Sequence, residues 1–200
     1  MKKVLFLVVC VLLLFCAVGA PAMARDTYPP YPAFWYGVGV DGSAYWIDEV
    51  NHTFGLTVNG MVPANVADVA IVGTWYCCTY GQSIAQAKAL RQTLDFWKDG
   101  QNGTILSLNE RAARGYWGRP YDPFAAYGVS GDLYNPKVQS GFWALDWIVW
   151  IGPLDAGTYW LTYKDSTAHN TVDPHFEKTP IHYPKGWVWA DYGPVSFEVK

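Results

Sequence analysis

Short apolar runs separated by Gly, Pro, Asn and Asp dominate the chain after residue 33. Runs of this length, when they alternate in polarity or consist of bulky side chains, are typical of β-strands. The last run alternates most clearly, because Val195, Phe197 and Val199 are separated by polar residues. The pattern predicts eight strands, at residues 34–40, 45–50, 54–58, 66–76, 104–108, 142–151, 158–164 and 195–199.

One segment has a different period. Within residues 82–98, apolar side chains recur every three or four positions, which predicts a helix with one apolar face. Ser83 is a suitable N-terminal cap, and Gly100 lies just past the end. These positions are Ile84, Ala87, Leu90, Leu94 and Trp97. Seven or eight short strands with one inserted helix predict a mostly β fold, a sandwich rather than a βαβ fold.

The first 24 residues form a separate pattern. Lys2 and Lys3 precede an uncharged apolar run at 4–19, and Ala22-Met23-Ala24 follows. This order of positive charge, apolar run and A-x-A site is that of a cleaved signal peptide. The alternative is an uncleaved membrane anchor, but a run of 16 residues is shorter than the roughly 20 that span a bilayer. We therefore expect residues 1–24 to be removed.

Cleavage after Ala24 leaves 176 residues with 12 basic and 17 acidic side chains, a net charge of −5. Residues 25–33 contain three prolines and predict an extended linker, so that residues 34–200 form a single β-sandwich domain. The charge argues against a nucleic-acid partner, and no later run is long and apolar enough to span a membrane. We expect a secreted, periplasmic or cell-surface protein.

Only two cysteines remain after cleavage, Cys77 and Cys78, and they are adjacent. A chain with so few cysteines has no disulfide framework, even in an oxidising compartment. Two alternatives stay open for this pair: a strained vicinal disulfide, or two buried free thiols on opposite faces of a strand.

Residues 155–161, Asp-Ala-Gly-Thr-Tyr-Trp-Leu, resemble the D-x-G-x-Y-x-C signature of immunoglobulin-like domains. Leu161 replaces the cysteine of that signature, so the resemblance is to the wider immunoglobulin-like β-sandwich superfold. It implies that Gly157 makes the tight turn and that the Tyr159 hydroxyl bonds to upstream backbone at the corner between two sheets. On this resemblance, Tyr159 has a role in stability.

Residues 165–193 are expected to form a long loop, unusual for a hairpin, and they hold three of the four histidines. His169, Asp173, His175 and His182 are weak candidates for a divalent metal site, because imidazole and carboxylate are the ligands that zinc takes. Their spacing matches no standard template, and the alternative is ordinary surface polarity. We expect no bound cofactor.

The strongest compositional signal is aromatic, with 11 Trp and 14 Tyr. Aromatic side chains either fill a core or, when exposed, stack on sugar rings or partner proteins. We expect those of residues 142–151 to be core, while Trp187, Trp189 and Tyr183 are the candidate ligand-binding residues because they adjoin the long loop.

The sequence contains no complete catalytic motif. The first hypothesis is therefore a non-enzymatic exported module for binding or assembly, with a protein or surface polysaccharide as partner. Carbohydrate binding through Trp187, Trp189 and Tyr183 is the second. A metal-dependent hydrolase that uses residues 165–193 is the third.

Overall fold

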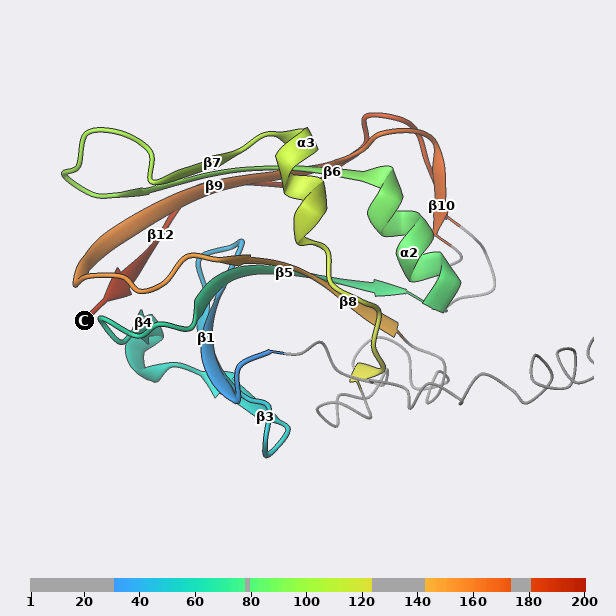
Figure 1. The fold of residues 1–200 in the computed structure, drawn as a ribbon. Coiled ribbons are helices and arrows are strands. Elements are labelled where there is room, and N and C mark those ends of the chain that lie inside the picture. The colour runs from blue at the N-terminus through green and yellow to red at the C-terminus, as the bar shows by residue number, and fades with distance from the viewer. Residues whose placement is uncertain (1–30, 78–79, 124–142, 174–180) are drawn as a thin grey trace, which may run out of the picture.

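A computed structural model describes residues 31–77, 80–123, 143–173 and 181–200. Two five-stranded sheets pack face to face, and a two-stranded hairpin lies at one end (Figure 1). The expected mostly β sandwich is confirmed in this form. Among the helices of the described residues, none combines the length and the apolar character needed to cross a membrane.

The first sheet has the strand order β3-β2-β1-β5-β8. All its neighbours are antiparallel except β1 and β5, which are parallel. In Figure 1, β1 and β3 turn away from the direction of β5 and β8, so the sheet is bent. Its strands are β1 (Phe34–Gly39), β2 (Ala44–Asp48), β3 (Thr53–Leu56), β5 (Val69–Cys77) and β8 (Trp143–Trp150).

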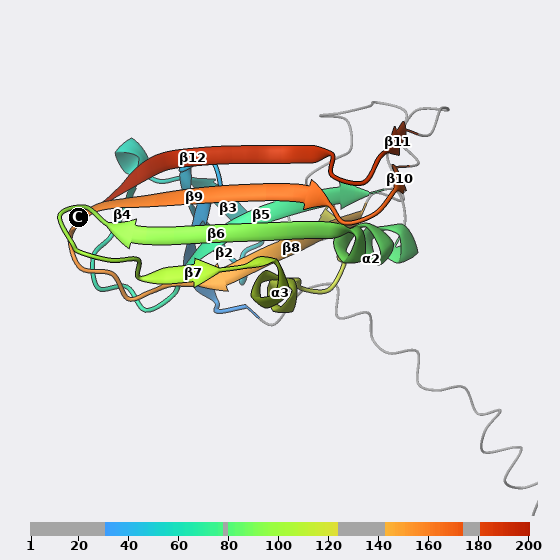
Figure 2. The same ribbon diagram turned by 90° about the horizontal axis from the view of Figure 1, so that it is seen from above.

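The second sheet has the order β4-β12-β9-β6-β7. Seen from above, β12, β9, β6 and β7 lie side by side over the first sheet (Figure 2). Its strands are β4 (Met61–Val62), β6 (Leu90–Lys98), β7 (Leu106–Leu108), β9 (Gly157–Thr167) and β12 (Val188–Val199), and the separate hairpin consists of β10 (Thr171–Asp173) and β11 (Ile181–Tyr183). Because β4 runs parallel to β12, both sheets are mixed, whereas the two sheets of an immunoglobulin domain are antiparallel.

Each of the eight predicted runs overlaps a strand of the structure. The run 142–151 corresponds to β8, in which every residue from Ala144 to Val149 is buried. A strand covered on both faces needs apolar residues at successive positions, which is the pattern that its sequence has.

The predicted helix at 82–98 is wrong over its second half. The helix α2 spans Tyr80–Ala89 and the next residue begins β6. In β6 the buried side chains alternate, at Leu90, Gln92, Leu94 and Phe96, which is a period of two. Leu90 and Leu94 satisfy both periods because four positions is a multiple of two and close to one helical turn. Pairing with β7 and β9 decides the outcome.

The expected long loop at 165–193 is also wrong in large part. The strand β9 continues to Thr167, and β12 begins at Val188 and pairs there with Ser166. The hairpin of β10 and β11 occupies the segment between them, with Val172 opposite His182. β12 accommodates Gly193 and Pro194 at one of the two register shifts in its pairing with β9, the shift between Tyr192 and Val195.

The segment that follows β7 begins with two short helical turns. Asn109 caps α3 (Glu110–Ala113) with its side-chain oxygen, and the 3₁₀ helix η2 (Arg114–Tyr116) follows. The indole of Trp147 in β8 donates to the carbonyl oxygen of Ala113 at 2.7 Å. This bond holds α3 against the first sheet. A second 3₁₀ helix, η1 (Val58–Gly60), precedes β4. Residues 124–142 lie outside the described residues.

The main core lies between the sheets, with Ile71 of β5 and Trp147 of β8 facing Leu94, Phe96 and Tyr163. The rings of Phe96, Tyr159 and Phe197 stack across β6, β9 and β12. The interplanar angle is 7° between Phe96 and Phe197, 12° between Phe96 and Tyr159, and 18° between Tyr159 and Phe197. Burial of such large rings is the main stabilising contribution that a sandwich obtains from its aromatic residues.

The corner expected at Tyr159 has the geometry of the motif. The Tyr159 hydroxyl donates to the carbonyl oxygen of Asp155 at 3.0 Å, and its ring is buried. Gly157 has a φ of 150°, in the region that favours glycine. The segment 151–156 joins β8 in the first sheet to β9 in the second, so the bond lies where the chain crosses between sheets.

A second apolar cluster lies on the other face of the first sheet. It contains Trp35, Ile47, Ala70, Val72 and Ile148. Alternate residues of a strand point to opposite faces, and on β5 Ile71 belongs to the main core whereas Ala70 and Val72 belong to this cluster. The bend of the first sheet allows Trp35 and Ile47 to cover this face of β5 and β8, and it creates the hollow described next.

Candidate functional site

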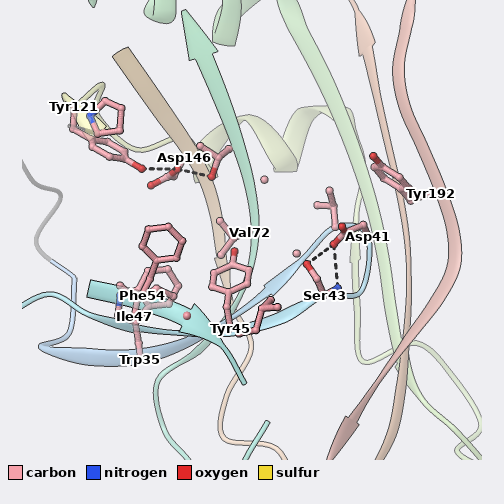
Figure 3. A pocket seen from close by; sticks show the side chains of 17 residues that line it. Trp35, Asp41, Ser43, Tyr45, Ile47, Phe54, Val72, Tyr121, Asp146 and Tyr192 are labelled. Carbon is pink, nitrogen blue, oxygen red and sulfur yellow. Dashed lines mark hydrogen bonds between the residues drawn. The ribbon is translucent and has the colours of Figure 1, made fainter. Parts of the chain in front are cut away.

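A pocket of about 660 Å³ lies beside the second apolar cluster. Its walls come from all five strands of the first sheet, together with Tyr121 and Pro123, and Tyr192 of β12 lines it from the second sheet (Figure 3). Ligand pockets of proteins have volumes of about 300–1,000 Å³. The bent sheet therefore provides a concavity of the size that a small molecule needs.

Aromatic rings form much of the wall. They are Trp35, Tyr45, Phe54, Tyr121 and Tyr192. Trp35 and Tyr121 are buried, whereas Phe54 and Tyr192 are 53% and 41% exposed. The pocket thus has an enclosed inner part and an open rim, both of which present ring faces.

Gly37 makes room for one of these rings. It lies opposite Tyr45 in the pairing of β1 and β2, and a Cβ atom at Gly37 would overlap the Tyr45 ring. The ring consequently lies close over the backbone of β1. In Figure 3, Tyr45 rises from β2 between the Asp146 side of the pocket and the Asp41 side.

Asp146 is the central polar group. It is 6% exposed, and its Oδ1 accepts hydrogen bonds from the Thr74 hydroxyl at 2.8 Å and the Tyr121 hydroxyl at 3.2 Å (Figure 3). Its Oδ2 accepts none from any described residue. Burial raises the pKa of Asp146 to about 6, the two hydroxyls oppose this shift, and the charge of Glu49 adds to it.

A second carboxylate, that of Asp41, lines the pocket on the side away from Asp146. Asp41 follows β1 in the turn to β2, and its Oδ1 accepts from the backbone N–H of Ser43 at 3.0 Å and from the Ser43 hydroxyl at 2.6 Å. Turns of this kind use Asp because its short side chain bonds to the backbone two residues on. Among the described residues, 17 line the pocket, and none of them is Lys, Arg or His.

Glu49 adds negative charge behind the aromatic wall. Its Oε1 accepts the indole N–H of Trp35 at 2.9 Å, which orients the Trp35 ring. The charge of Glu49 acts on the buried carboxyl of Asp146. The pocket is therefore aromatic and acidic.

The three predicted ligand-binding residues lie together at the β10–β11 end, apart from this pocket. The ring centroid of Tyr183 is 4.0 Å from that of Trp189 and 5.7 Å from that of Trp187. Trp187 is 47% exposed. A shallow pocket of about 320 Å³ adjoins them and is lined by His182 and Tyr183 among others.

The weak metal candidates are only partly within the described residues. His182 is exposed on β11, and His169 is exposed between β9 and β10. His175 and the side chain of Asp173 lie outside the described residues. Among the side chains that the structure describes, no three His, Cys, Asp or Glu gather as a metal site would require.

Cys77 is the last residue of β5, and its side chain and the whole of Cys78 lie outside the described residues. The choice between a vicinal disulfide and two free thiols stays open.

Comparisons with known proteins give no relative for this chain. No protein-family model matches it, no curated protein matches it, and no solved structure matches it. The structure defines a mixed-sheet β-sandwich with an aromatic, acidic pocket.

Sequence reasoning did not find this pocket. One signal was present, because Asp146 is the single charged residue in a run that was expected to be buried on both faces. A lone carboxylate in such a strand needs hydrogen-bond partners, and here Thr74 and Tyr121 provide them. The aromatic wall gave no local signal, because its members come from separate strands.

Proposed function

We propose that this protein is an exported, non-enzymatic binding module that takes a small molecule into the pocket beside Asp146. The single observation that carries the proposal is the combination of an aromatic wall with a buried carboxylate in a cavity of about 660 Å³. Binding pockets are lined mainly by apolar and aromatic groups, with a few polar groups that orient the ligand.

The location outside the cytoplasm is part of the proposal and rests on the signal-peptide pattern at 1–24. The immunoglobulin-like assignment is also a proposal. The hydrogen bond from Tyr159 to Asp155 supports it, while the parallel pairs in both sheets depart from that fold.

The test uses the exposed ring at the rim of the pocket. Phe54→Ala removes a wall without disturbing the core, because Phe54 is 53% exposed. The matched control is Ile105→Ala, which removes a side chain of 50% exposure next to β7 in the other sheet. Choline, glucose and benzoate serve as cationic, neutral and anionic probes in fluorescence titrations of the secreted protein.

We expect at least one probe to bind the wild type at millimolar concentration or below, with an affinity that falls at least threefold in Phe54→Ala and is unchanged in Ile105→Ala. The proposal is overturned if the wild type binds none of the three probes, or if the two variants bind equally well.

The cluster of Tyr183, Trp187 and Trp189 favours a second candidate function, carbohydrate binding. Three rings gathered beside the β10–β11 hairpin, one of them 47% exposed, offer apolar faces to a sugar polymer. Soluble cellulose and chitin oligomers are suitable probes. The candidate predicts that Trp187→Ala abolishes retardation of the protein in gels that contain such a polymer, while Phe54→Ala leaves it intact.

A further inference from the structure

We propose that the ligand of the pocket is an organic cation, an ammonium group that carries apolar substituents. This inference rests on the proposed function, because it names the ligand class of the same pocket.

The charged side chains of the pocket are acidic. Asp146 and Asp41 are the ionisable acids among the lining residues, and the described lining contains no basic residue. The negative charge of Glu49 also acts on Asp146 and disfavours its ionised form. A buried carboxylate that lacks a cationic partner is costly, and the cost falls when a cation occupies the site. The charge distribution therefore favours a cation and disfavours an anion.

Several hydrogen-bond donors around the pocket already bond to carboxylates. The hydroxyls of Thr74 and Tyr121 already donate to Asp146, and the Ser43 hydroxyl already donates to Asp41. The indole N–H of Trp35 already donates to Glu49. These four donors are thus committed to carboxylates.

One acceptor of the pocket can still take a hydrogen bond from a ligand. Within the described residues, Oδ2 of Asp146 accepts no hydrogen bond. A ligand that donates or carries positive charge satisfies that oxygen, whereas a sugar also needs donors for its own oxygen atoms. The hydrogen-bond pattern therefore favours a cation over a carbohydrate in this pocket.

The aromatic wall of the pocket also suits a cation. Aromatic faces attract cations through their quadrupoles, and quaternary ammonium groups are recognised by cages of such rings. The pocket offers five aromatic residues, and the hydroxyl of one of them, Tyr121, donates to Asp146 (Figure 3). A bare metal ion needs several oxygen ligands instead. The wall therefore suits a cation with apolar substituents.

The experiment compares two probes of equal shape. Choline and 3,3-dimethylbutan-1-ol differ by a positively charged nitrogen in place of a carbon. Titration calorimetry with the full secreted chain is expected to give choline at least a tenfold higher affinity. Asp146→Asn, which keeps the size of the side chain, is expected to abolish most of this preference. Asp99→Asn, an exposed carboxylate beyond β6, is the matched control and is expected to retain it.

A second variant keeps the test valid if Asp146→Asn does not fold. Phe54→Leu keeps an apolar side chain at the exposed rim but removes the ring, so choline is expected to lose affinity more than its neutral isostere. Glucose is titrated in parallel.

Equal binding of the two isosteres, a preference that survives Asp146→Asn, or tighter binding of glucose would each overturn the cation assignment. In those cases binding that remains sensitive to Phe54→Ala leaves the proposed binding module standing. Absence of binding by every probe overturns both.

Discussion

Asp146 and Asp165 are the two buried carboxyl groups among the described residues. They belong to opposite sheets and have different surroundings. Asp146 lines the pocket, while Asp165 lies in β9 and accepts from the Gln92 amide at 3.3 Å and the Tyr163 hydroxyl at 3.4 Å. Burial raises the pKa of Asp165 to about 7, and these hydrogen bonds oppose that shift only in part.

The raised pKa of Asp165 predicts how stability depends on pH. Its native pKa of about 7 exceeds the ordinary value of 3.8 for an aspartate, so between those values the folded state holds a proton that the unfolded state has lost. The stabilisation is complete below pH 3.8 and is lost as the pH rises through about 7. The free energy of unfolding is expected to fall by at most about 4 kcal/mol over this pH range, because a tenfold change in proton affinity corresponds to about 1.4 kcal/mol. Urea unfolding from pH 4 to pH 8 measures it.

Asp165→Asn tests this assignment. The variant has no proton to lose at this site, so its stability relative to the wild type should increase from pH 4 to pH 8. Asp146, whose pKa is also raised, leaves a smaller slope of the same sign in the variant. Asp99→Asn is the control for removal of a surface carboxylate. An unchanged pH slope in Asp165→Asn would show that Asp165 is not the residue responsible.

Secondary-structure elements were predictable where only one period fits the sequence. The alternation at 195–199 and the apolar run at 142–151 each predicted a strand, and β12 and β8 occupy them. The segment 82–98 was not predictable in the same way, because Leu90 and Leu94 fit a helix and a strand equally. Its second half becomes β6 through ladders to β7 and β9, which are distant in sequence.

The corner between β8 and β9 carries a prediction at this scale. Tyr159→Phe removes the hydroxyl that donates to Asp155 and leaves the ring stack with Phe96 and Phe197 in place. We expect a loss of about 1 kcal/mol in the free energy of unfolding, the typical contribution of one hydrogen bond. Tyr116→Phe, at an exposed ring, is the control. Equal thermal unfolding of the wild type and Tyr159→Phe would refute the structural role of the corner.

At the scale of the whole molecule, the bend of the first sheet links the fold to the pocket. It places Trp35 and Ile47 over β5 and β8, and the remaining hollow is lined by residues from all five strands. The helix α2 joins β5 to β6 and so carries the chain from the first sheet to the second (Figure 1). A ligand held by several strands in this way is expected to stabilise the folded sandwich.

Export is the prediction that concerns the whole chain. We expect cleavage at the A-x-A site to give a mature protein that begins at Arg25, because small residues before the cut admit the peptidase. Mass spectrometry of the protein recovered from outside the cytoplasm should show this terminus, and Ala24→Lys should prevent its formation. A protein that retains Met1 in the same fraction would contradict it.

The amino-acid pattern alone was enough to establish a mostly β chain, the position of eight strands and the motif at Asp155, Gly157 and Tyr159, because these depend on neighbours close in sequence. The mixed strand order, the end of α2 at Ala89 and the assembly of the pocket required the folded chain. They depend on pairing and burial between residues far apart, such as Thr74 with Asp146, and no local period encodes those contacts.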